Sequence, residues 1–411
     1  MTERSEAEFA DFIDNLATQL IDHAPTFESF VAAMPGVLPD EALASLRRMN
    51  GPQAERLATD AANDRAGSII DQCAALPLPH PLDSEFRFDE MTARILARGL
   101  IEATRSGDEI LLIGVPTVAI ELAVAKEDRR IRFLGPDNCV TAAVQAAFQG
   151  RELLLDQGPG GTAAAALLDP PWYATPMAEL IQVGAWGCRQ GARLNLVLPP
   201  IGTRPEVELD RSTFLALAAE AGMTPTGISA PVCYRTPLFE LAALERQGIA
   251  RLPSWRRGDA VEFITQAAAT RHLWQRPVTT EFSVQGVRLR LAPGATGAGP
   301  TLVPIEGHEV FSSVSQRAPG RSQATLWTTT NRAFWVDPAA TTSAFSRLAR
   351  DPTLWHLGLN WQKKEHRYVE CVDTGDQLAH QLVELVGREL DDARRLVGDG
   401  AWLKAEMDWR S

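Results

Sequence analysis

The chain has 411 residues, a formal net charge of -12, 45% hydrophobic residues and 22% charged residues. This length exceeds one ordinary hydrophobic core, so we expect more than one domain. The acidic balance argues against broad, backbone-driven nucleic-acid binding, and no apolar run approaches the roughly 20 residues of a membrane span. Five scattered cysteines without a CxxC pair indicate neither a disulfide framework nor a metal site. We therefore expect a cytoplasmic protein with no membrane partner and no metal.

Residues 1–85 are expected to form a helical region. Apolar side chains recur at spacings of three and four from Phe9 to Ile21, as on one face of an amphipathic helix. Such a region serves as a helical cap or binds a protein partner. The proline-rich stretch 76–81 favours extended backbone and is expected to be a linker.

Residues 86–250 show helical and strand patterns in alternation. Helices are expected over 89–104, 116–126, 140–148, 177–188 and 211–221, and strands over 109–115, 131–134, 152–155, 163–168 and 193–198, with two more within 226–240. This alternation predicts a doubly wound, mostly parallel seven-stranded α/β sheet. The last two strands lack a long crossover, so we expect that pair to be antiparallel.

The remainder of the chain has a different pattern. Residues 251–345 alternate polar and apolar side chains, which predicts a β-rich module. Residues 346–411 are expected to be helical, with an amphipathic helix over 376–396. The fold class is therefore α/β, with a helical N-terminal region and an α+β C-terminal module.

A local excess of arginine marks the β-rich module. Ten Arg and five acidic residues lie between Arg251 and Trp335, inside an otherwise acidic chain. Guanidinium groups close to indoles can neutralise phosphates and stack on bases. The candidate nucleic-acid contacts are Arg256, Arg257, Arg317, Arg321 and Arg332. A sheet with one aromatic core face and one solvated arginine face is the alternative, and the oligomeric state stays open.

The stretch 163–173, AAAALLDPPWY, is the most informative part of the sequence. Its apolar half predicts a strand buried on both faces, and the two prolines end the hydrogen-bond ladder. Asp169 then lies at the carboxyl end of this strand, where open α/β sheets bind their ligands. A carboxylate or carbonyl that accepts hydrogen bonds from an exocyclic amine localises its lone pair, and a stacked ring fixes its orientation. We expect Asp169, the Pro170 carbonyl, Pro171 and either Trp172 or Tyr173 to act in this way.

The order of strands, with acidic turns and DPPW after the fourth, resembles class I S-adenosylmethionine (SAM) methyltransferases. The chain from about Ile110 to Glu240 is similar to the DPP[FYW] adenine-N6 methyltransferases, including their Gly-x-Pro first turn. The resemblance implies a SAM site at Gly114, Pro116, Thr117, Asp137, Asn138, Asp156 and Gln157. In place of the carboxylate that would bind the ribose directly after the second strand, this chain has Gly135.

The resemblance favours methyl transfer from SAM to an exocyclic amine, with adenine-N6 in nucleic acid as the first candidate. Two other interpretations stay open. Branched-chain polyamine synthases share the layout and a DPP turn, so aminopropyl transfer to a polyamine is one. An inactive methyltransferase-fold scaffold in a multiprotein complex is the other, because the cofactor side departs from the usual pattern.

Overall fold

A computed structural model describes residues 5–63, 73, 75–126, 128–136, 138–156, 158, 160–266, 269–274, 280–284, 286–292, 299, 301–305, 310–311, 320–350 and 377–397. The chain divides into two compact units. The first comprises Met1–Ala66, Phe86–Thr236 and Gly248–Arg276, and the second comprises Gly67–Glu85, Pro237–Gln247 and Pro277–Ser411.

The first unit begins with a set of short helices. They are α1 (Glu6–Leu20), the 3-10 turn η1 (Ile21–His23), α2 (Phe27–Ala32), α3 (Pro39–Arg48) and α4 (Pro52–Asp60). Ser5 caps α1 in a capping box with Glu8, and the apolar stripe buries Phe9 and Ile13. The predicted helical start of the chain is confirmed.

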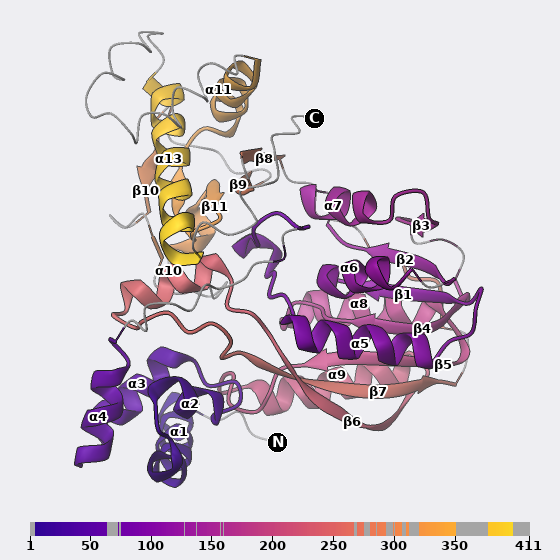
Figure 1. Cartoon of the computed structure of the whole chain (residues 1–411), viewed down its shortest axis with the longest axis horizontal. Helices are drawn as coiled ribbons and strands as arrows, with labels where there is room; N and C mark the ends of the chain where they lie inside the picture. The colour runs from indigo at the N-terminus through magenta and orange to yellow at the C-terminus, as the bar shows by residue number, and fades with distance from the viewer. Residues whose placement is uncertain are drawn as a thin grey trace. The chain divides into compact units, whose positions relative to one another are not determined.

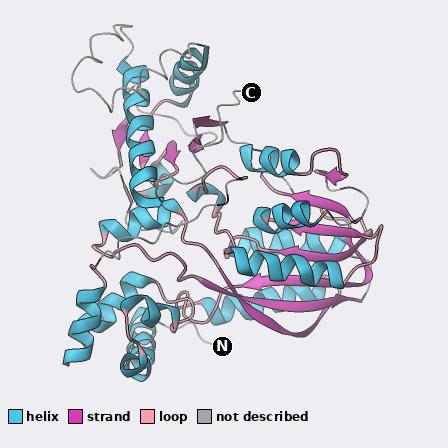
Figure 2. Ribbon diagram, viewed as in Figure 1, coloured by secondary structure: helices cyan, strands magenta, loops and turns pink. Residues whose placement is uncertain are grey.

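A seven-stranded sheet forms the centre of the first unit (Figures 1 and 2). Its strands are β1 (Glu109–Ile113), β2 (Arg130–Leu134), β3 (Leu153–Leu154), β4 (Ala163–Leu168), β5 (Cys188–Leu198), β6 (Met223–Cys233) and β7 (Arg257–Thr265). They follow the order β3-β2-β1-β4-β5-β7-β6. Neighbours from β3 to β5 are parallel, and β7 is antiparallel to both β5 and β6. The predicted doubly wound, mostly parallel seven-stranded sheet is confirmed.

Helices cover both faces of this sheet. They are α5 (Glu90–Glu102), α6 (Pro116–Ala125), α7 (Cys139–Ala147), α8 (Ala174–Gly187) and α9 (Val207–Glu220). Figure 1 shows α5 and α6 on one face and α8 and α9 on the other. Gly187 and Gly184 of α8 lie so close to Leu111 and Leu168 that an added Cβ would come within 2.6 and 2.4 Å of their side chains. These glycines let α8 pack directly on the sheet.

The closing strand pair differs from our expectation. The pair is antiparallel as predicted, but Leu238–Arg246 forms helix α10, and the second strand of the pair is β7 at Arg257–Thr265. Residues 238–244 are buried throughout, so the segment lacks the one-sided polarity that distinguishes a helix from a strand. The sheet therefore extends beyond residue 250, where we expected the domain to end.

The second unit combines a small antiparallel sheet with helices. Its strands are β8 (Thr280–Val284), β9 (Val287–Leu291), β10 (Val303–Pro304), β11 (Leu326–Thr328) and β12 (Ala333–Trp335), in the order β10-β12-β11-β9-β8. The 3-10 turns η2 (Pro81–Asp83) and η3 (Arg321–Gln323) and the helices α10, α11 (Pro338–Arg350) and α13 (Gln377–Val397) complete it. One apolar core joins the sheet to these three helices. The expected antiparallel strands and the amphipathic helix near residue 380 are confirmed.

Candidate active site

Two turns meet at the carboxyl ends of β1 and β4. These strands are neighbours in the sheet, and the chain leaves them for helices on opposite faces, so this is the switch point of the sheet. Gly114, after β1, has a φ of +72°, and an added Cβ would lie 2.8 Å from the carbonyl oxygen of Asp169. The Asp169 amide donates to the carbonyl of Ile113 at 3.0 Å. The first-turn glycine and the DPPW aspartate are therefore in direct contact.

The carboxyl group of Asp169 has a hydrogen-bonded partner that the sequence did not reveal. The hydroxyl of Tyr234 donates to Asp169 Oδ1 at 2.8 Å. Although Asp169 keeps some accessible surface, desolvation by burial raises the pKa of its carboxyl to about 8. The Tyr234 hydrogen bond and the positive charge of Arg256 both act to lower this pKa, but desolvation outweighs them.

Aromatic rings surround this carboxyl group and its partner. The Trp172 ring meets Tyr234 edge to face, with centroids 5.9 Å apart, and Phe88 lies 4.9 Å from Tyr234. The guanidinium carbon of Arg256 lies 3.8 Å from the centroid of Phe86 and 5.5 Å from that of Trp172. These distances are within the range for cation–π contact. The site thus combines a desolvated carboxyl, a phenol, a guanidinium and several rings.

Tyr234 reaches the site because of how the sheet closes. It follows the end of β6, pairs with Phe88 in an isolated antiparallel bridge, and donates its amide to the carbonyl of Arg256 at 3.1 Å. Since β6 runs in the same direction as β4, its end lies at the same edge of the sheet. The sequence signal for this residue is a tyrosine directly after a strand. We expected both closing strands within 226–240, so Tyr234 was not placed at a strand end.

The DPPW turn is held in place by a neighbouring loop. Arg204 donates from Nη2 to the carbonyl oxygen of Trp172 at 2.7 Å and is ion-paired with Asp210. The Tyr173 amide donates to Pro171 at 2.8 Å, and Tyr173 then stands at the N-cap of α8. Of the two aromatic candidates, Trp172 contacts the ring of Tyr234. Pro170, next to Asp169, is buried.

The first-turn residues form the beginning of α6. Pro116 occupies the first position of the helix, where a missing N–H costs nothing. Thr117 is 7% exposed, and its Oγ1 is buried without a hydrogen-bond partner among the described residues. A buried hydroxyl at the N-terminus of α6, three residues after Gly114, suits a polar or anionic group of a ligand. This side fits the amino-acid end of SAM, the cofactor that the sequence resemblance implies.

On the adenosine side of the expected cofactor site, fewer side chains are available to bind a ligand. The Asn138 Oδ1 accepts from the amide of Val140 and so caps α7. Asp156 is exposed, but its carboxylate receives a hydrogen bond from Arg132, which also pairs with buried Glu109. Both side chains therefore already have structural partners. The other two candidates on this side, Asp137 and Gln157, lie outside the described residues.

Gly135 has a local reason to be glycine. An added Cβ would come within 2.7 Å of the Phe133 ring and 3.1 Å of Thr141 Oγ1. A carboxylate-bearing residue therefore does not fit this position without moving Phe133. The structure thus explains in steric terms why the expected ribose carboxylate is absent here.

The arginines of the proposed nucleic-acid patch do not form one exposed surface in the described part of the chain. Arg256 is 8% exposed and belongs to the aromatic site. Arg332 is 9% exposed and pairs with Glu389 at 2.7 Å and Asp392 at 2.6 Å. Our assignment of these two residues as phosphate contacts is therefore corrected. Arg257 is half-buried in β7, and Arg317 and the side chain of Arg321 lie outside the described residues.

Two further arginines of the local excess are also neutralised. Arg288 is fully buried and pairs with Asp83 at 2.6 Å, Glu85 at 3.0 Å and Glu281 at 2.9 Å. Arg290 is ion-paired with Asp83 and Glu281 as well. These three carboxylates and two guanidinium groups form one buried cluster in the second unit. A count of arginines in the sequence segment therefore overstated its surface charge.

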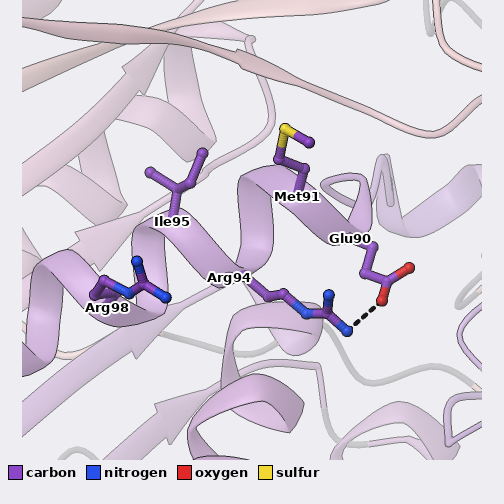
Figure 3. A pocket seen from close by; sticks show the side chains of 5 residues that line it. All are labelled: Glu90, Met91, Arg94, Ile95 and Arg98. Carbon is purple, nitrogen blue, oxygen red and sulfur yellow. Dashed lines mark ion pairs between the residues drawn. The ribbon is translucent and has the colours of Figure 1, made fainter.

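A shallow hollow lies along the exposed face of α5 (Figure 3). Its lining residues are Glu90, Met91, Arg94, Ile95 and Arg98. Met91 is 73% exposed, and Glu90 forms an ion pair with Arg94. The hollow contains none of the predicted site residues. Within the described ranges, no group of His, Cys, Asp and Glu is arranged to hold a metal ion, and no helix is long and apolar enough to cross a membrane.

Comparison with known proteins finds similarity to solved structures only. No protein-family model and no curated protein matches this sequence. Among solved structures, the branched-chain polyamine synthase from Thermus thermophilus, in complex with N4-aminopropylspermidine and 5'-methylthioadenosine, is 12% identical, with a TM-score of 0.47 over 63% of this chain and 88% of its own. The 16S rRNA (adenine(1408)-N(1))-methyltransferase from Catenulisporales acidiphilia is 17% identical, with a TM-score of 0.27 over 42% of this chain and 94% of its own.

Proposed function

We propose that this protein is a SAM-dependent methyltransferase that acts on an amine nitrogen. The observation that carries the proposal is the direct contact between the Gly114 turn and Asp169 at the switch point of the sheet. Ligands of open α/β sheets bind at such a switch point. A methyl donor at the first turn and an amine at Asp169 would therefore be neighbours, as direct transfer requires.

The residues present suggest a division of roles. Gly114, Pro116 and Thr117 would hold the amino-acid end of SAM, which supplies an electrophilic methyl group on a sulfonium sulfur. Asp169 would accept a hydrogen bond from the acceptor N–H and keep the nitrogen lone pair aimed at that methyl group. The sulfur of SAM would keep the electrons of the broken carbon–sulfur bond as the acceptor nitrogen takes the methyl group, and Asp169 would accept the proton that this nitrogen loses.

The aromatic surroundings favour a planar acceptor. Trp172 is half-buried and lies beside Asp169, so a flat ring can stack on it while its exocyclic amine reaches the carboxyl group. We propose an exocyclic amine of the adenine-N6 type as the acceptor. If that base is part of a nucleic acid, cations other than Arg256 and Arg332 must bind its phosphates, because both of these arginines are buried.

Aminopropyl transfer to a polyamine is the second candidate, and one observation favours it. A carboxyl with a pKa of about 8 is closer to the range of an alkylammonium than an ordinary aspartate, so it is better suited to take the proton that such an acceptor must lose. The donor would then be decarboxylated SAM. Because that donor lacks the carboxylate, the buried Thr117 hydroxyl would lose an anionic partner.

Calorimetric titration with SAM, decarboxylated SAM and S-adenosylhomocysteine tests the proposal. We expect SAM and S-adenosylhomocysteine to bind, and Thr117→Val to weaken both. A preference for decarboxylated SAM would favour aminopropyl transfer instead. The absence of binding by all three at millimolar concentration would refute both enzymatic functions.

Transfer itself is tested with tritiated SAM and adenine-containing oligonucleotides or nucleosides. Asp169→Ala should abolish methyl transfer and leave SAM affinity unchanged, because Asp169 is assigned to the acceptor. Asp22→Asn, an exposed carboxylate in the same unit, is the matched control and should change neither quantity. Unchanged turnover of Asp169→Ala would remove Asp169 from the reaction.

A further inference from the structure

We propose that Tyr234 is the positioning residue of the active site, which holds Asp169 by one carboxyl oxygen and leaves the other oxygen to the acceptor amine. This inference rests on the proposed function and adds a residue to it. The Tyr234 hydroxyl donates to Oδ1 of Asp169 at 2.8 Å. No other hydrogen bond to this carboxyl from a described residue is found, so Oδ2 is the oxygen that remains for a ligand.

Tyr234 is itself held firmly from several directions. It is 1% exposed, and its ring is packed between Phe88 and Trp172. Its backbone is fixed by the bridge to Phe88, by the bond to Arg256 and by Ser254, whose hydroxyl donates to the Tyr234 carbonyl at 2.9 Å. A side chain with so little freedom can orient its partner without losing conformational entropy when a substrate binds.

The charges around the pair determine which way the phenol acts. Arg256, just before β7, faces both groups, and Asp259 on β7 acts on Tyr234. Burial and the nearby Asp169 raise the pKa of Tyr234 well above its usual value. The phenol therefore stays protonated and serves as a donor at every working pH. As a donor to Oδ1 it favours the ionised form of Asp169, against the desolvation that favours the neutral form.

Tyr234 thereby affects both the orientation of the Asp169 carboxyl group and its ionisation. An acceptor N–H needs an ionised or at least an accepting oxygen, and a buried carboxyl without the phenol would be neutral over a wider pH range. With the phenol in place, activity should rise with pH to a plateau above about pH 8, the pKa of Asp169. We call this rise of activity with pH the acidic limb. The hydroxyl of Tyr234 determines the pH at which it occurs.

Tyr234→Phe is the variant that tests this role, since it keeps the ring and removes only the hydroxyl. Loss of one hydrogen bond to the charged form should raise the pKa of Asp169 by about one unit. Below pH 7 the kcat for methyl transfer should therefore fall about tenfold, and above pH 10 it should approach that of the wild type. The KM for SAM should stay the same.

A packing variant separates positioning from a structural role. Phe88→Leu loosens the ring contact but keeps the Tyr234 hydroxyl, so it should lower activity at all pH values without moving the acidic limb. A Tyr234→Phe profile that is lowered uniformly, like that of Phe88→Leu, would overturn the inference. A profile identical to that of the wild type would overturn it as well.

A measurement without substrate distinguishes this inference from the proposed function. Carboxyl-13C NMR of the full chain, with the Asp169 signal assigned by Asp169→Asn, gives the pKa of Asp169 in wild type and Tyr234→Phe. A shift in this pKa without any SAM binding would refute the proposed function and with it the role of Tyr234 in it. SAM-dependent transfer together with an unchanged Asp169 pKa would refute only the role of Tyr234.

Discussion

Replacing Asp169 by asparagine should stabilise the first unit at neutral and alkaline pH. Asparagine keeps an oxygen that accepts the Tyr234 hydrogen bond, but it has no charge to desolvate. In the wild type, burial raises the carboxyl pKa from 3.8 to about 8. Because the folded-state pKa is the higher one, the folded protein holds this proton more tightly, and its stability falls as pH rises from about 4 to 8.

The size of this effect follows from the pKa difference. At about 1.4 kcal/mol per pKa unit, the upper limit above pH 8 is roughly 5–6 kcal/mol. Asp169 retains accessible surface, and water screening reduces this figure, so we expect Asp169→Asn to gain about 2–3 kcal/mol at pH 8 and almost nothing at pH 4. Burial also raises the pKa of Glu41 to about 7, but this contribution is the same in both proteins and cancels.

Urea denaturation read by hydrogen exchange of the β1 and β4 amides reports on the unit that contains Asp169. The free energy of unfolding of wild type and Asp169→Asn would be compared at several pH values between 4 and 9, with Asp22→Asn as the surface control. A difference that grows with pH agrees with the argument. A difference that is constant with pH, or that favours the wild type at pH 8, would show that the carboxyl is not desolvated.

Two other substitutions test packing that the sequence did not reveal. Gly114→Ala should destabilise the first unit by roughly 2–4 kcal/mol, since a Cβ at positive φ meets the Asp169 carbonyl; urea denaturation measures this, and a neutral effect would mean that the two turns can separate. Arg332→Ala should destabilise the second unit by roughly 3–5 kcal/mol because Glu389 is left buried without its cation, and Arg332→Ala combined with Glu389→Gln should recover part of that loss in the same assay. Equal stability of the single and double variants would argue against a buried ion pair.

The sequence predicted the parts of the fold whose signal is local. A parallel strand buried on both faces is a continuous apolar run, and β1 and β4 both have this pattern. The Asp169 turn followed from the prolines that end β4. Helix α10 was missed because it is buried all round, so its residues show neither a period of 3.6 nor a period of 2.

The contacts between residues of the candidate site cannot be read from their spacing in the sequence. Tyr234 is 65 residues from Asp169 along the chain, and the two residues meet because β4 and β6 end at the same edge of the sheet. The charge of the arginine-rich segment was misjudged for the same reason. The carboxylates that pair with Arg288 include Asp83 and Glu85, which come from a distant part of the chain.

The position of β7 has a consequence for synthesis of the chain. Among the described strands, β7 is the neighbour of β6 in the sheet, yet α10 of the other unit is translated between them. On the ribosome, β6 therefore emerges about 25 residues before its partner, and both β6 and the outer edge of β5 have unpaired backbone groups in that interval. Neither unit is a contiguous segment of the chain, so cotranslational folding of the seven-stranded sheet must wait until residue 265 has left the exit tunnel.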